Sequence, residues 1–152
     1  MYQSLIVFHS LVRWLVLLSL VYSIYRACRG YYQNLGFSKV DNYSRHWTAT
    51  IAHVQLLIGI LLYTQSPVTR EFWKNINIAI SNFNAAFFGF IHIILMLAAI
   101  VLLTIGSAKA KRKSTDKEKF KTVLVWFSVA FVIIFIAIPW PFSPLANRPY
   151  LR

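Results

Sequence analysis

Three histidines lie inside long apolar stretches of the sequence, where polar side chains are rare and costly. His9, His53 and His92 each fall in a different stretch. A histidine in such a place can form a hydrogen bond between helices, or it can serve a function. Neutral imidazole is a common axial ligand of haem iron, and a non-covalent haem needs only an apolar pocket around it. The residue types therefore leave two interpretations, a site for haem b or a set of structural hydrogen bonds.

His9 and His92 are the preferred pair of metal ligands because their depths match. Each follows the start of its apolar stretch closely, and at about 1.5 Å per residue both lie roughly 10–15 Å below the same interface. Their two helices run in the same direction and would be diagonal in an up-and-down bundle. His53 enters from the opposite side and lies deeper, so it is an alternative ligand, a ligand of a second cofactor or a contact for a quinone headgroup.

Arg13 and Gly89 complete the predicted cofactor site. Arg13 lies four residues after His9 and shares a helical face with it. All four carboxylates fall outside the apolar stretches, so a haem propionate or a quinone oxygen would supply the anion that a buried guanidinium requires. Gly89, one turn before His92, would leave space for a flat macrocycle. Two further glycines, Gly59 and Gly106, are expected to serve helix packing.

Charge-free runs locate the helices that must hold these residues. The runs between Arg45 and Arg70, Lys74 and Lys109, and Lys121 and Arg148 contain 24, 34 and 26 residues. About 20 apolar residues cross a hydrocarbon core of about 30 Å. With the first stretch, this predicts a single transmembrane domain over residues 1–152, with spans at about 4–25, 48–64, 85–108 and 122–138.

Proline and asparagine residues predict where the spans begin and end. Pro67 should end the second span, and Pro139 the fourth, because proline cannot continue a helix. Asn82 or Asn84 can cap the third. The segment between, residues 68–84, is predicted to be a loop on the membrane surface.

The distribution of lysine and arginine predicts the orientation. The loops at residues 26–47 and 109–121 together carry 11 basic residues, whereas the other side carries 4. The side with more lysine and arginine residues is expected to be cytoplasmic. The fold class is therefore an all-α integral membrane protein, an antiparallel up-and-down bundle of four transmembrane helices with both termini outside the cytoplasm.

Several other functions are disfavoured by composition. The net charge is +12, but the basic residues flank the apolar runs, where they meet anionic membrane lipid rather than nucleic acid. Cys28 is the only cysteine, which excludes a thiolate metal cluster and covalent haem attachment. The absence of carboxylates from the spans weakens proton-relay and cation-transport interpretations.

The sequence resembles a family of small four-span bacterial membrane proteins labelled cytochrome b or cytochrome b-like. The resemblance implies haem-dependent electron transfer, with iron held by ligands among His9, His53 and His92. One departure is Ile91, because members of that family tend to carry an acidic residue just before the third-span histidine. The similarity covers most of the chain and lies in His9-Ser10-Leu11-Val12-Arg13-Trp14-Leu15-Val16, Ala52-His53-Val54-Gln55-Leu56-Leu57-Ile58-Gly59, Tyr63, Ser66-Pro67, His92, Met96, Thr104-Ile105-Gly106-Ser107-Ala108-Lys109-Ala110-Lys111 and Ile138-Pro139-Trp140.

Two functional hypotheses follow. The first is a haem b electron carrier of the bacterial inner membrane, moving single electrons between the quinone pool and a redox partner protein. The residues favour an electron carrier over a substrate-converting enzyme, and whether any substrate is converted stays open. The alternative is a non-catalytic scaffold or assembly subunit of a larger membrane complex. The number of haems and any homo-oligomeric state stay open at this point.

Overall fold

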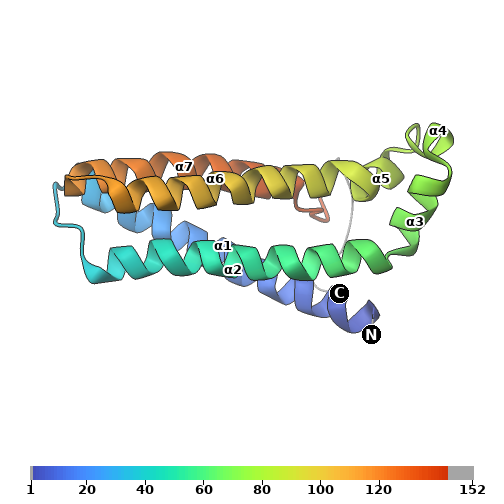
Figure 1. Ribbon diagram of the computed structural model, residues 1–152, viewed down its shortest axis with the longest axis horizontal. Coiled ribbons are helices and arrows are strands. Elements are labelled where there is room, and N and C mark those ends of the chain that lie inside the picture. Colours follow the sequence, from blue (N-terminus) through green and yellow to red (C-terminus); the bar gives the residue numbers. More distant parts are fainter. Residues whose placement is uncertain (1, 144–152) are drawn as a thin grey trace.

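Four long helices make up most of the chain in the computed structural model, which describes residues 2–143 (Figure 1). Helices α1 (Tyr2–Tyr32) and α2 (Lys39–Gln65) form one half of the bundle. The third long helix combines α5 (Phe83–Ala86), a π-helical turn η1 (Phe87–Ile91) and α6 (His92–Arg112), and the fourth is α7 (Asp116–Ala137). All four are long and apolar enough to cross a membrane. The predicted all-α four-helix fold is confirmed, and it indicates a multi-pass membrane protein that contacts lipid.

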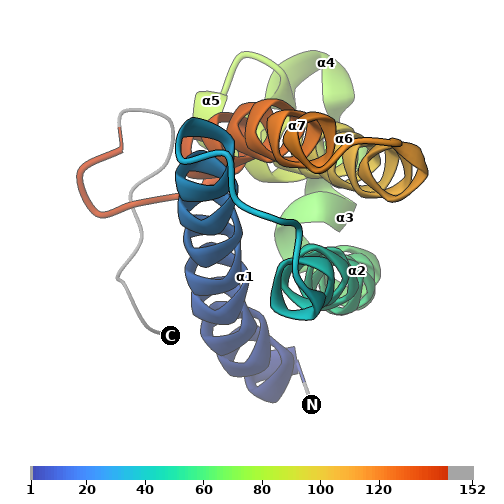
Figure 2. The same ribbon diagram turned by 90° about the vertical axis from the view of Figure 1, so that its left-hand side faces the viewer.

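The helices pack as a ring of neighbours. Helix α1 packs against α2 and α7, and α6 packs against the same two helices. The end-on view in Figure 2 shows α7 between α1 and α6. Helices α1 and α6 are therefore diagonal, which is the arrangement predicted for the helices that carry His9 and His92.

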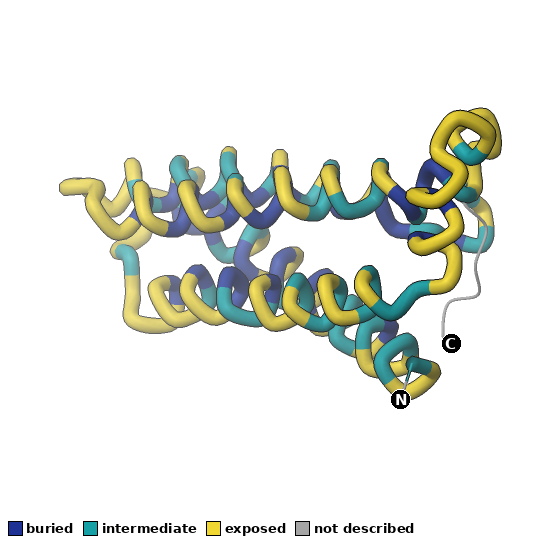
Figure 3. Tube along the Cα trace, turned by 45° about the vertical axis from the view of Figure 1, so that its right-hand side comes forward, coloured by how far each residue is buried: buried dark blue, intermediate teal, exposed yellow. Residues whose placement is uncertain are grey.

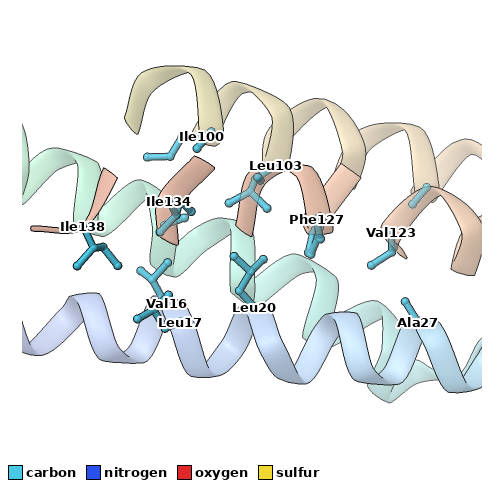
Figure 4. Packing of buried hydrophobic residues seen from close by; sticks show 14 of the residues in the cluster. Val16, Leu17, Leu20, Ala27, Ile100, Leu103, Val123, Phe127, Ile134 and Ile138 are labelled. Carbon is cyan, nitrogen blue, oxygen red and sulfur yellow. The ribbon is translucent and has the colours of Figure 1, made fainter. Parts of the chain in front are cut away.

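Apolar side chains fill the centre of the bundle. Leu20, Leu103 and Phe127 have no exposed surface, and they meet between α1, α6 and α7 (Figure 4). The outward faces are exposed along most of their length (Figure 3), where large apolar side chains would meet lipid. At Gly106 a Cβ atom would overlap Trp126 of α7. This glycine therefore allows two helices to approach closely, as the sequence predicts.

The loops predicted at residues 26–47 and 109–121 are largely helical, which corrects the expected boundaries. Helix α1 continues to Tyr32, and only residues 33–38 connect it to α2; only residues 113–115 connect α6 to α7. Hydropathy marks where a helix leaves the hydrocarbon, but a helix does not need to end there. Lys109, Lys111 and Arg112 lie in the last turn of α6, where positive charge stabilises the helix C-terminus.

The connection between α2 and α5, predicted to be a loop, also contains helices. Helix α2 ends at Gln65, and Ser66 caps the short helix α3 (Pro67–Lys74), which α4 (Ile76–Ala79) follows.

The predictions that the second and fourth long helices end before Pro67 and Pro139 are confirmed. Asn82 caps α5 by accepting a hydrogen bond of 3.2 Å from the Ala85 amide, as predicted. Arg148 and Arg152, which entered the charge count, lie outside the described residues.

Asp41 connects the start of α2 to the end of α1, outside the predicted membrane-spanning part of both helices. Its carboxylate accepts hydrogen bonds from Arg26 Nε (2.7 Å) and from the backbone amide (2.8 Å) and hydroxyl (2.6 Å) of Ser38. Burial opposes ionisation of this carboxyl, but the hydrogen bonds from Arg26 and Ser38 outweigh it and hold its pKa below the usual value. The ionised carboxylate therefore stabilises the fold.

Asp41→Asn is expected to destabilise the protein by about 1–2 kcal/mol at neutral pH, the usual cost of losing a helix cap. Because the folded-state pKa is lowered, the stabilisation is present above the unfolded pKa of about 4 and is lost as pH falls through the folded value. Thermal unfolding of both proteins in detergent from pH 7 to pH 3 should show the difference shrinking with acidity. A constant difference across that range would contradict this role.

Candidate functional site

His9 and His92 are brought together by the diagonal helices α1 and α6. Their imidazole ring centroids are 6.5 Å apart, and the ring planes are inclined by 66°. The prediction that the two histidines lie at matching heights on diagonal helices is therefore confirmed. Both side chains line the same cavity between the helices.

The cavity has a volume of about 240 Å³ and lies toward the end of the bundle that α3 covers. Most of its wall is apolar, and most of its polar lining residues belong to α1 and α2. Within the part of the chain that the structure describes, none of its lining residues is acidic. A concave, mainly apolar site with a few converging polar groups is the usual form of a cofactor pocket. Its wall includes Ile6, Val16, Leu56, Ile60, Ile93, Met96, Ile134 and Ile138.

The orientation of His92 is set by the end of α7. His92 Nδ1 lies 2.8 Å from the carbonyl oxygen of Ala137. In a helix that carbonyl would accept from the amide four residues later, but residue 141 is proline and has no N–H. Because a carbonyl only accepts, Nδ1 carries the proton and Nε2 keeps its lone pair. A backbone carbonyl on one imidazole nitrogen is the common support for a histidine that binds metal through the other.

His9 is positioned by α2. The side-chain amide of Gln55 donates to the His9 backbone oxygen at 2.9 Å, an interhelical hydrogen bond. A Cβ atom on Gly59 would lie 3.3 Å from His9 Cε1, so this edge of the imidazole faces the glycine. His9 Nδ1 and Gln55 Oε1 are buried and lack a hydrogen-bond partner among residues 2–143. Unsatisfied buried polar atoms are rare in native proteins, and they mark places where a bound group is expected.

Arg13 brings positive charge to the same cavity. Its Nη2 donates to Ser10 Oγ at 3.3 Å, and its guanidinium lies 5.6 Å from the centroid of the Trp14 ring. Arg13 lines the cavity together with both histidines. The predicted grouping of His9, Arg13 and His92 is therefore present.

His53 does not join this group. Its Nδ1 lies 2.7 Å from the Ala49 oxygen, and its Nε2 lies 3.2 Å from Thr104 Oγ1 on α6. The side chain is exposed and does not line the cavity. Depth alone could not reveal this, because the helical face that His53 occupies depends on how α2 is rotated in the bundle.

Gly89 does not leave space for a cofactor, which corrects the prediction made from its position before His92. The ring of Phe72, on α3, lies where a Cβ atom of residue 89 would be. The Gly89 carbonyl accepts a hydrogen bond of 2.7 Å from the Tyr63 hydroxyl. The π-helical turn η1 widens the helix between Gly89 and His92, so a residue one turn back no longer shares the histidine's face. The glycine beside the site is Gly59, which was predicted to serve helix packing.

Comparison of the chain with family models, curated proteins and solved structures gave no match. Among residues 2–143, no group of three or more histidine, cysteine or acidic side chains could hold a metal ion. The chemistry of the cavity must therefore be inferred from His9, His92 and their surroundings.

Proposed function

We propose that the protein is a haem b electron carrier of the bacterial inner membrane, linked to the quinone pool or a redox partner protein, with His9 and His92 as axial ligands. The observation that carries this proposal is the 6.5 Å between the two imidazole centroids. At this separation, His9 and His92 could hold one iron between their imidazoles.

The number of donors also favours haem over a bare metal ion. A structural zinc site takes four protein ligands, and a catalytic one takes three. The cavity offers two imidazoles, and no larger group of metal-binding side chains occurs among residues 2–143. Haem contributes four nitrogen ligands of its own and supplies an iron that accepts and returns one electron. Two protein ligands are then sufficient.

The remaining residues of the cavity would tune such a site. The hydrogen bond from His92 Nδ1 to the Ala137 carbonyl fixes which nitrogen can bind and makes it more basic. The aliphatic wall would give the group apolar surroundings. Arg13 would neutralise a propionate, and its positive charge would favour the reduced form and raise the reduction potential.

The direct test is a dithionite-reduced minus air-oxidised visible spectrum of detergent-purified protein, expressed with an adequate supply of haem. We expect a sharp α band, and a pyridine haemochrome assay should give about one haem per chain. A colourless protein that purifies with companion proteins would contradict the proposal. The two histidines would then serve interhelical hydrogen bonding in a scaffold subunit.

A further inference from the structure

A second pocket lies at the opposite, basic end of the bundle. Its volume is about 360 Å³, and three helices contribute to it: the start of α2, the end of α6 and the start of α7. Each of these helices brings one lysine, Lys39, Lys111 and Lys119 respectively. The other lining residues are Phe37, Ser38, Asn42, Tyr43 and Ala110.

The amide of Asn42 is oriented by a buried arginine. Arg45 is only 5% exposed, and its Nη1 donates to the backbone oxygen of Ser107 at 2.7 Å. Its Nη2 donates to Asn42 Oδ1, also at 2.7 Å. The oxygen of the Asn42 amide is thereby occupied, so its NH₂ group is the part that can donate to a ligand in the pocket. The site therefore combines ammonium groups with an oriented neutral donor.

The net charge of the side chains around the pocket is positive, even when the neighbouring carboxylates are included. Lys119 pairs with Asp116 at 3.0 Å, and its ammonium lies 5.7 Å from the Phe37 ring centroid. Lys39 and Lys111 form no ion pair within the described part of the chain. Asp41, which bonds to Ser38 of the pocket, is balanced by Arg26. The three lysines and Asp116 then leave two positive charges, which matches a ligand with one or two negative charges.

Exposed aromatic side chains place the pocket at the level of lipid headgroups. Tyr43, which lines the pocket, is 59% exposed, and Trp47, one turn further along α2, is 57% exposed. On α7, the ring of Trp126 lies 4.6 Å from the ammonium of Lys109. Tyrosine and tryptophan gather at the membrane–water interface, where phospholipid phosphates lie.

We propose that this pocket binds the phosphate of an anionic phospholipid, of the phosphatidylglycerol or cardiolipin class. Lys39, Lys111 and the Asn42 amide would donate charge-assisted hydrogen bonds to the phosphate oxygens. Basic pockets between transmembrane helices bind anionic headgroups in this way. The lipid site is independent of the haem proposal, because it lies at the other end of the bundle from His9 and His92.

The test compares the Lys39→Gln/Lys111→Gln double variant with an Arg29→Gln/Lys121→Gln control. Both remove two positive charges from exposed side chains near the same end, but only the first pair lines the pocket. Native mass spectrometry in a zwitterionic detergent would measure binding of phosphatidylglycerol and phosphatidylcholine. We expect the first variant to bind phosphatidylglycerol roughly thirty-fold more weakly, since each lysine near an anionic headgroup contributes about fivefold. The control should bind like the unmodified protein.

Three results would overturn the proposal. Equal loss in both variants would mean that binding depends only on total charge. Equal binding of phosphatidylcholine would mean that the pocket does not select anionic lipid. If millimolar inorganic phosphate displaced all of the bound phosphatidylglycerol, the ligand would be a free anion rather than a lipid headgroup.

Discussion

The His92→Ala variant should lose the reduced-minus-oxidised haem spectrum while still inserting into the membrane. The substitution removes one of two imidazoles that line the cavity and are 6.5 Å apart. A haem with a single axial histidine in an open cavity would be held weakly and lost during purification, so we expect bound haem to fall by more than about tenfold. His9→Ala should have the same effect.

The matched control for this prediction is His53→Ala. It removes another histidine from an apolar stretch, but one that is exposed and does not line the cavity. Its haem content should equal that of the unmodified protein. Because His92 also bonds to the end of α7, each variant should first be shown to elute as a single species in detergent. A full-intensity, unshifted spectrum from His92→Ala would remove this residue from the ligand set.

Gly106→Val should have the largest effect on stability. A Cβ at this position would overlap the Cβ and ring of Trp126, and a tryptophan Cβ cannot move without the backbone of α7. Forcing extra atoms into a packed interface costs about 1–3 kcal/mol and sometimes more. We expect a cost of about 3 kcal/mol, because helices α6 and α7 must separate.

Ala108→Val is the matched control, since residue 108 is on the same helix and is exposed. It introduces the same side chain with a change of about 0.5 kcal/mol or less. Denaturation of both variants in detergent, followed by circular dichroism, compares them directly. Similar unfolding midpoints would show that the α6–α7 contact tolerates a larger residue and that Gly106 does not set helix spacing.

Most of the fold could be predicted because it depends on length and local chemistry. Uninterrupted apolar runs determine the spans, and Pro67, Asn82 and Pro139 act on their own helices. Helical rise was sufficient to match the depths of His9 and His92. Each of these predictions needs only the chain's local geometry.

The errors concern residues whose neighbours are distant in sequence. Arg45 was counted as a surface charge, but its partner Ser107 is 62 residues away and holds it inside the bundle. The rotation of α2, which turns His53 outward, and the π-helical turn before His92 both depend on packing between helices. Gly89 shows the same dependence, because Phe72 reaches it from a helix that was predicted to be a loop.

The cavity occupies only the α3 end of the bundle, and under the haem proposal this position would have a bioenergetic consequence. Beyond it, Leu20, Leu103 and Phe127 fill the interior with no exposed surface, and α6 continues for about 30 Å from His92 to Arg112. With a single redox centre at that end, an electron would enter and leave by the same face of the membrane. Such transfer displaces no charge across the membrane, so the reaction would be electroneutral and would not contribute to the membrane potential.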